Sequence, residues 1–107
     1  MQIFVVETQP DAAARALCDK HVISQIGETA EMLALAHVVA GEGLPPQYVL
    51  KPRTRHLHHP CVQWVAATAG SYRWAHKLAT ALLLEYTHRY KRFHAYQMDV
   101  LQRHQVA

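Results

Sequence analysis

Apolar residues follow a helical period most clearly between residues 19 and 40. Five of them repeat at the spacing of about 100° per residue that is typical of an amphipathic α-helix. They are Val22, Ile26, Leu33, Ala36 and Ala40. The polar residues Lys20, Ser24 and Glu31 fall on the opposite side and are expected to face solvent. Gly41 follows directly and is expected to end this helix.

The chain before residue 19 predicts a short extended segment and a further helix. Residues 3–6 are β-branched and aromatic, and Thr8 is expected to cap a helix that ends near Cys18. No second strand is predicted, so we expect no sheet.

The middle of the chain predicts a long loop and a short helix. Glycines and prolines cluster after residue 40, and no clear period returns before Pro60. Residues 41–59 are therefore predicted to form one irregular loop. Pro60 is expected to begin a short helix that ends at Gly70.

Two helices are predicted in the last third of the chain. Ser71 is expected to cap the first, which runs to about Tyr90. Its core stripe consists of Trp74, Leu78, Ala81 and Leu82. The second is expected over residues 92–104. Its buried side chains are expected to be Phe93, Tyr96, Val100 and Leu101. The whole pattern predicts an all-α fold, with residues 1–107 forming a single helical domain of four to five helices and one long irregular loop.

Charge is unevenly distributed along the chain. Residues 1–50 carry six acidic and two basic residues, whereas residues 51–107 carry nine Lys and Arg against two acidic residues. Seven of the nine histidines also lie in this second half. Such a basic half favours a polyanion, and DNA is the partner that we expect. A solvated basic surface without a partner is the alternative.

Cysteine usage and the longest apolar runs indicate the compartment. Cys18 and Cys61 are far apart in the sequence, which favours free thiols in a reducing environment. No secretory leader is expected, because acidic Glu7 follows residues 1–6 without a basic region, and no apolar run is long enough to cross a bilayer. We therefore expect a cytoplasmic protein with no membrane partner.

One flank of the predicted 19–40 helix carries candidate catalytic residues. His21, Gln25 and Glu28 lie at positions i, i+4 and i+7, beside the apolar stripe. A carboxylate there is expected to be partly desolvated and suited to proton transfer or to stabilising a developing cation. We interpret Glu28 and His21 as catalytic and Gln25 as substrate-binding. A structural Glu28, hydrogen-bonded to His21 or to the following loop, is the alternative.

The predicted long loop and the residues after it supply candidate substrate contacts. Basic side chains that precede a helix N-terminus form a typical phosphate-binding arrangement. Here they are Lys51, Arg53, Arg55 and His59. Trp64 and Tyr72 follow, and their rings are candidates for stacking against an extruded base, the alternative being ordinary core positions.

Glu85 falls on the apolar stripe of its helix, with Arg89 one turn further on. A structural ion pair is the expected arrangement. We also consider Arg89 as a phosphate ligand in a cleft shared with Glu28. The histidines around residues 56–59 lack the spacing of a zinc site, so neither a metal nor another cofactor is expected. Arg89 and His94 have the Arg-x4-His spacing of HEPN ribonucleases, which gives a further hypothesis.

Two resemblances follow from these residues. The chain resembles a group of small phage-encoded proteins in the segments Cys18-Asp19-Lys20-His21-Val22, Glu28, His59-Pro60, Trp64, Tyr72-x-Trp74 and Glu85-Tyr86-Thr87-His88-Arg89-Tyr90. It is more distantly similar to the all-α phage pyrimidine-dimer DNA glycosylases with AP-lyase activity, in which a DNA-contacting His precedes the catalytic Glu by seven residues. His21 and Glu28 match that spacing. The resemblance implies that an amine attacks the anomeric carbon of the sugar, and that Glu28 stabilises the ring-opened sugar and assists elimination. A phage origin would place the protein in the host cytoplasm.

Three features depart from that family. Gln2 stands where the family has a small residue whose α-amine is the nucleophile, Gly27 replaces an Arg just before the Glu, and the aromatic, basic C-terminal tail is missing. The first hypothesis is therefore a DNA-base-directed enzyme, of glycosylase/AP-lyase type or a phage base-modification enzyme. The second is a non-catalytic helical module that binds nucleic acid or protein, and the third is a HEPN-like ribonuclease.

Overall fold

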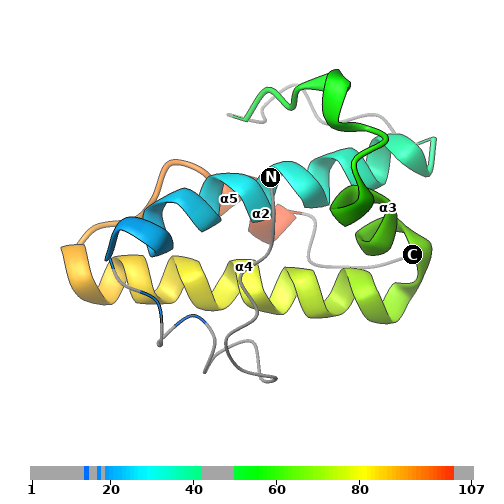
Figure 1. Cartoon of the computed structure of the whole chain (residues 1–107). Coiled ribbons are helices and arrows are strands. Elements are labelled where there is room, and N and C mark those ends of the chain that lie inside the picture. Colours follow the sequence, from blue (N-terminus) through cyan, green and yellow to red (C-terminus); the bar gives the residue numbers. More distant parts are fainter. Residues whose placement is uncertain (1–13, 15–16, 18, 42–49, 103–107) are drawn as a thin grey trace.

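The structure of the protein is a computed structural model in which residues 14, 17, 19–41 and 50–102 are described. These residues form four α-helices and one 3₁₀ turn, and none of them lies in a β-strand (Figure 1). The elements are α2 (Asp19–Val39), η1 (Thr54–His56), α3 (Pro60–Ala67), α4 (Ala69–Tyr90) and α5 (Gln97–Gln102). The predicted all-α class is confirmed. The extended segment and the helix predicted before residue 19 lie largely outside the described residues.

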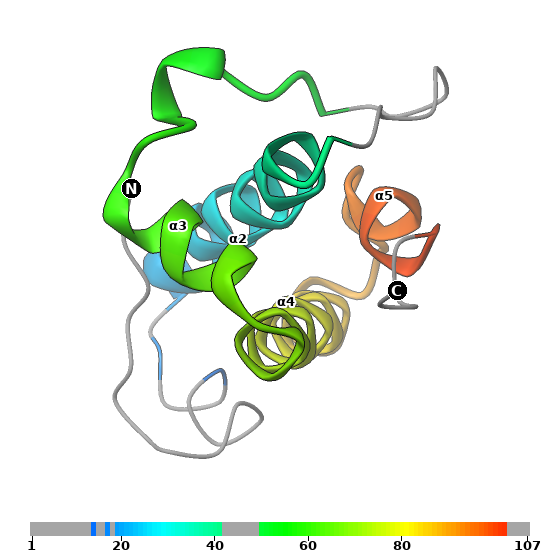
Figure 2. The same ribbon diagram turned by 90° about the vertical axis from the view of Figure 1, so that its right-hand side faces the viewer.

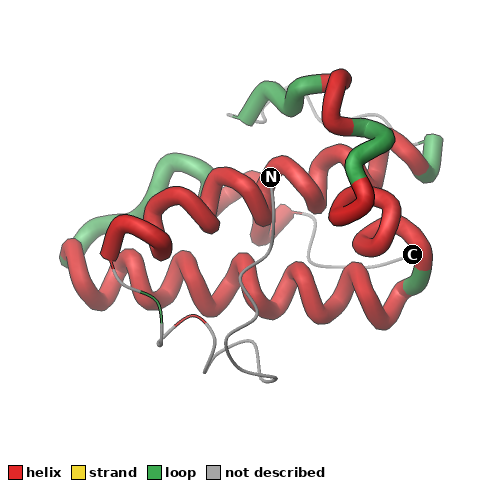
Figure 3. The backbone as a smooth tube through the Cα atoms, viewed as in Figure 1, coloured by secondary structure: helices red, strands yellow, loops and turns green. Residues whose placement is uncertain are grey.

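The two long helices, α2 and α4, form the centre of the molecule. They run side by side in opposite directions (Figure 1, Figure 3). Along their axes, α3 and α5 are seen on opposite sides of this pair, and the segment before α3 passes over α2 (Figure 2). None of the described helices combines the length and the apolar character that crossing a bilayer requires.

The second half of α2 is buried on every side, over residues 29–37. Four residues of the predicted stripe are buried as expected: Val22, Ile26, Leu33 and Ala36. Ala40 is exposed, and the helix ends just before Gly41, close to its predicted end. The prediction that Glu31 faces solvent is wrong, because residues 50–56 cover that side of the helix and Glu31 is only 3% exposed.

The junction of α3 and α4 lies two to three residues earlier than predicted. α3 begins at Pro60 as expected, and the Nδ1 atom of His59 caps it by accepting a hydrogen bond from the backbone N–H of Cys61. Thr68 then adopts an extended conformation, with φ −142° and ψ 157°, and ends α3. Its Oγ1 accepts a hydrogen bond from the N–H of Ser71 at 2.9 Å. Thr68, and not Ser71, is therefore the N-cap of α4.

The last helix is shorter than predicted. Lys91 adopts the left-handed conformation (φ 59°) and ends α4, so residues 91–96 form a non-helical connection to α5. Val100 is buried as predicted, whereas Tyr96 is only half-buried and lies in the connection before α5. Phe93 lies in the connection and is 73% exposed, so the prediction that it is buried is wrong.

Candidate active site

A cleft of about 280 Å³ lies where α2, the segment before η1 and the connection between α4 and α5 meet. This volume is close to the lower end of the ~300–1,000 Å³ that is typical of ligand sites. The lining residues are Ser24, Gly27, Glu28, Glu31, Leu50, Lys51, Arg53 and Tyr96. The cleft therefore joins three segments that are far apart in the sequence.

Four residues of α2 line the cleft because their spacing of i, i+3, i+4 and i+7 puts them on one helical face. One of them, Gly27, has no side chain, and a Cβ atom at this position would meet nothing within 4 Å. The cleft is therefore open beside Glu28. Glu28 itself is half-buried, so its side chain is partly shielded from water but lies at the wall of an accessible cleft.

The segment before η1 is fixed at both of its ends. The backbone N–H of Leu50 donates to Oδ2 of Asp99 at 2.8 Å, and Asp99 is buried in α5. The backbone N–H of Arg53 donates to Oε2 of Glu31 at 3.1 Å. Carboxylates on two helices thus hold this segment over α2, and they place Lys51 at the cleft between the two anchor points.

Glu31 is the centre of the best-defined polar network in the cleft. Its carboxylate accepts hydrogen bonds from Nε and Nη2 of Arg53, both at 3.1 Å, and its Oε1 lies 2.8 Å from Nδ1 of His56. Burial raises the pKa of Glu31, but the hydrogen bonds from Arg53 and His56 outweigh this effect, and the net pKa is lowered. Glu31 is therefore held as a carboxylate.

Arg53 connects the two carboxylates of the cleft. Its pKa is raised, first by its hydrogen bonds to Glu31 and to a smaller extent by the charge of Glu28. Glu28 therefore lies within electrostatic reach of the guanidinium group. The Arg53 side chain is 56% exposed, so it remains accessible to a ligand although one edge is bound to Glu31.

Three of the residues predicted from the sequence share this cleft: Glu28, Lys51 and Arg53. The other two candidates on α2 are not among its lining residues. His21 is exposed, and Gln25 is buried with 2% of its surface accessible. The predicted catalytic pair of His21 and Glu28 is thus placed on one helix, but only Glu28 faces the cleft.

The remaining candidates from the loop and α3 lie outside the cleft lining. Arg55 is exposed in η1, and His59 caps α3. Trp64 is 46% exposed, and its ring packs edge to face against Trp74 with a centroid distance of 6.1 Å. Trp64 is therefore an accessible aromatic surface on α3, separate from the cleft.

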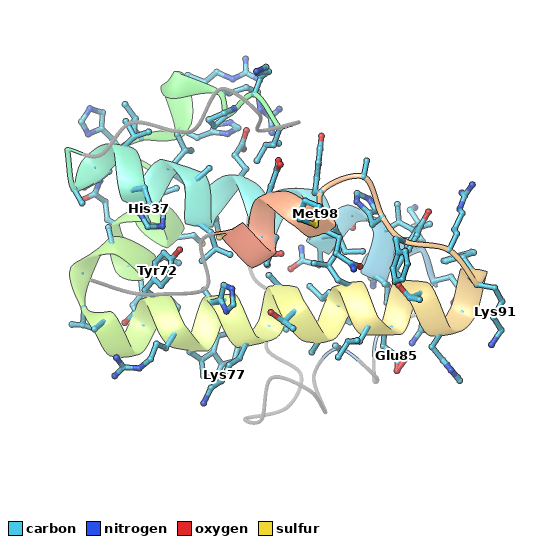
Figure 4. All side chains as sticks on the ribbon, turned by 180° about the vertical axis from the view of Figure 1, so that it is seen from behind. His37, Tyr72, Lys77, Glu85, Lys91 and Met98 are labelled. Carbon is cyan, nitrogen blue, oxygen red and sulfur yellow. The ribbon has the colours of Figure 1, made fainter. Side chains whose placement is uncertain are left out.

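Tyr72 occupies a core position. It is 6% exposed, and its hydroxyl is hydrogen-bonded to Nε2 of His37. The two side chains point toward each other between α2 and α4 (Figure 4). Of the two interpretations of Tyr72, the structure favours the core position over a ring that stacks against an extruded base.

Arg89 forms the ion pair that the sequence predicts. Its Nε donates to Oε2 of Glu85 at 3.1 Å, and its Nη1 donates to Oδ1 of Asp19 at 2.9 Å. Arg89 thereby ties the end of α4 to the start of α2. It is not among the residues that line the cleft with Glu28, so the structure does not bring the two together as a shared phosphate site.

His94, the partner of Arg89 in the ribonuclease hypothesis, is packed against aromatic rings. Its ring contacts Tyr86 edge to face and Tyr96 at a tilt, with centroid distances of 4.9 and 5.2 Å. Burial, with a contribution from the charge of Arg92, lowers the pKa of His94. Within the part of the chain that the structure describes, no group of three or more His, Cys, Asp or Glu side chains is placed to hold a metal ion.

Two important residues of the cleft were missed in the sequence. Glu31 was placed on the solvent side, although its position one turn after Glu28 puts it on the same helical face. Tyr96 was expected only to be buried in a helix, and it lines the cleft from the connection before α5. The spacing of residues in the sequence could have placed Glu31 in the cleft, but it gave no such signal for Tyr96.

Comparison with known proteins gives one match. The model of the family described as pyrimidine dimer DNA glycosylase matches residues 1–103, which is nearly the whole chain. Neither the curated proteins nor the solved structures contain a match to the chain.

Proposed function

The chain belongs to the pyrimidine dimer DNA glycosylase family, and from this we propose that it excises damaged pyrimidines from DNA at the cleft around Glu28. One observation carries the proposal. The cleft combines a half-buried carboxylate with Lys51 and Arg53, which come from a separate segment of the chain. This combination provides a group for sugar chemistry next to groups that bind phosphate.

Glu28 is the proposed catalytic residue. Cleavage of the bond between base and sugar leaves positive charge on the sugar, and a nearby carboxylate stabilises that charge. The similarity to the glycosylase/AP-lyase proteins implies a second role for Glu28 after attack by an amine, in which it stabilises the ring-opened sugar and assists elimination. The half-buried Glu28 lies at the wall of an open cleft, where a ligand can reach it, and this supports a catalytic role over a carboxylate that is sealed in the protein. His21 and Gln25, on the same helix, remain candidates for contacts with the substrate.

The basic segment next to the cleft is the proposed site of backbone contact. Lys51, Arg53 and Arg55 are all exposed. Phosphate oxygens of DNA are bound mainly by Lys and Arg side chains, and these contacts set the position of the protein on the strand. His59 and Trp64 follow in the chain and would extend this contact surface along α3.

The first experiment measures excision directly. A duplex with a single cyclobutane pyrimidine dimer is incubated with the protein, and cleavage of the glycosidic bond and of the strand is followed; the same duplex without the lesion is the control. We expect a product only from the damaged duplex. Equal cleavage of both duplexes, or cleavage of RNA instead, would contradict the proposal.

A binding experiment tests the phosphate contacts. Replacing Lys51, Arg53 and Arg55 together with Ala should weaken duplex binding and reduce the salt slope by close to three, since each lost phosphate contact removes about one from it. Arg73→Ala is a matched control, because Arg73 is exposed on α4, which supplies no residue to the cleft lining. An unchanged affinity and salt slope in the triple variant would exclude this segment as the DNA contact.

Trapping with borohydride tests the lyase step. Attack by an amine on the sugar gives an imine, which borohydride reduces to a stable covalent link. A covalent adduct between the protein and the damaged DNA would support the glycosylase/AP-lyase chemistry. Retained DNA binding without an adduct and without excision would favour a base-modifying enzyme or a non-catalytic binding module.

A further inference from the structure

We infer that Glu31 is a positioning residue, which orients Arg53 to hold one backbone phosphate of the DNA so that the neighbouring sugar is placed at Glu28. This inference rests on the proposed function and adds to it a residue that does not touch the DNA. The observations that carry it are the geometry of the Glu31–Arg53 pair, its place in the cleft and the burial of Glu31.

The pair leaves one edge of the guanidinium group for a ligand. Arg53 uses Nε and Nη2 to bind both carboxylate oxygens of Glu31, and its backbone N–H binds the same carboxylate. Its Nη1 has no hydrogen-bond partner among the described residues, and more than half of its side chain is exposed. A guanidinium fixed along one edge presents its remaining N–H groups in a defined direction, which suits a phosphate oxygen.

Burial of Glu31 makes this orientation rigid. The Glu31 side chain is 5% exposed, and its Oε1 accepts a further hydrogen bond from Nδ1 of His56 at 2.8 Å. His56 thus holds the buried carboxylate independently of Arg53, and the exposed arginine binds to a fixed partner. Arg55 is exposed in the same segment. Of the two arginines, Arg53 is therefore the one with a fixed position.

The Glu31–Arg53 pair lies close enough to Glu28 for a phosphate bound by Arg53 to place its sugar at this carboxylate. Glu28 and Glu31 are one turn apart on the same face of α2, a rise of about 4.5 Å along the helix axis. Both line the cleft with Arg53. A phosphate held at Arg53 therefore lies next to the carboxylate that acts on the sugar. Displacing the reacting groups by about 1 Å can reduce the reaction rate by about 100-fold. We therefore expect the orientation of Arg53 to affect kcat more than it affects the affinity for DNA.

Two conservative substitutions separate positioning from simple charge. Arg53→Lys keeps the positive charge but cannot bind both oxygens of Glu31, and Glu31→Gln removes the carboxylate without touching the DNA. The matched control is Arg73→Lys on α4. For each variant, we would measure kcat on the dimer-containing duplex under saturating conditions, the Kd for undamaged duplex and the thermal midpoint. The double variant Glu31→Gln/Arg53→Lys completes a cycle.

We expect kcat to fall at least 10-fold in Arg53→Lys and in Glu31→Gln, and the Kd for undamaged duplex to change less than about threefold in Arg53→Lys. The double variant should be no slower than Arg53→Lys alone, because Glu31 acts through Arg53. A kcat of Arg53→Lys equal to that of the wild type would overturn the inference, as would multiplicative losses in the double variant. If Glu31→Gln does not fold, the kcat of Arg53→Lys still tests whether catalysis requires the two-point pairing of Arg53 with Glu31. Absence of excision by the wild-type protein would instead remove the proposed function, and the inference with it.

Discussion

Replacing two glycines of the fold with alanine tests how backbone conformation at each position affects stability. Gly27 lies inside α2, and Gly41 follows its end with a φ of +84°. A Cβ atom would meet nothing within 4 Å at either position, so steric contact does not distinguish them. Glycine inside a helix is less stable than alanine by about 0.5–1 kcal/mol. Alanine with positive φ is disfavoured by about 1–2 kcal/mol.

The two alanine variants should therefore have opposite effects. Gly27→Ala is expected to raise the free energy of unfolding by about 0.5–1 kcal/mol, and Gly41→Ala to lower it by about 1–2 kcal/mol. At about 4–8 °C per kcal/mol for a domain of this size, calorimetry should show the first midpoint about 2–8 °C higher and the second at least about 4 °C lower. Two shifts of the same sign would refute this reasoning. A lower midpoint for Gly27→Ala would show that the cleft wall is closed at this point.

Three further predictions concern the interior. Glu85→Gln should reduce stability by about 1–3 kcal/mol, measured by urea unfolding, because it removes the charged hydrogen bond to the largely buried Arg89; an unchanged midpoint would show that the ion pair contributes nothing. Tyr72→Phe should reduce stability by about 1–2 kcal/mol without changing excision, since it removes the buried hydrogen bond to His37 and keeps the ring in the core. A loss of excision in a folded Tyr72→Phe would return Tyr72 to the active site. Burial lowers the pKa of His94 from 6.5 in the folded protein, so on acidification the unfolded chain is protonated at this residue at a higher pH than the folded protein. The free energy of unfolding should therefore decrease as the pH falls below about 6.5. His94→Gln should flatten this decrease between pH 7.5 and 5.5, and an equal slope in both proteins would exclude His94 as its cause.

The helices that could be predicted from the sequence are those with a long, regular apolar period. The helix that begins at Asp19 and the one that ends at Tyr90 were both found, because their stripes extend over several turns. Their ends depended on local hydrogen bonds. The end of α4 at Tyr90 agrees with the prediction, with Lys91 in the left-handed conformation as its C-cap, but Thr68 and not Ser71 is its N-cap.

The cleft was only partly predictable, because its walls are set by tertiary contacts. Glu28 could be found from its position beside an apolar stripe. The spacing from Glu28 places Glu31 on the cleft face of α2, but the burial of Glu31 depends on the segment that ends with Arg53 and folds back over this helix, and helical periodicity contains no information about that segment. The burial of Tyr72 likewise depends on its partner His37, which lies on another helix.

Single-turnover excision by Glu28→Gln tests the central claim most directly. Gln has nearly the same size as Glu and can form hydrogen bonds, but it cannot carry the negative charge that stabilises the sugar cation. With excess protein on a dimer-containing duplex, we expect excision to fall by about 100-fold or more, with the thermal midpoint and the Kd for the duplex close to those of the wild type. Excision at the wild-type rate by a folded, DNA-bound Glu28→Gln would contradict the assignment of this cleft as the active site.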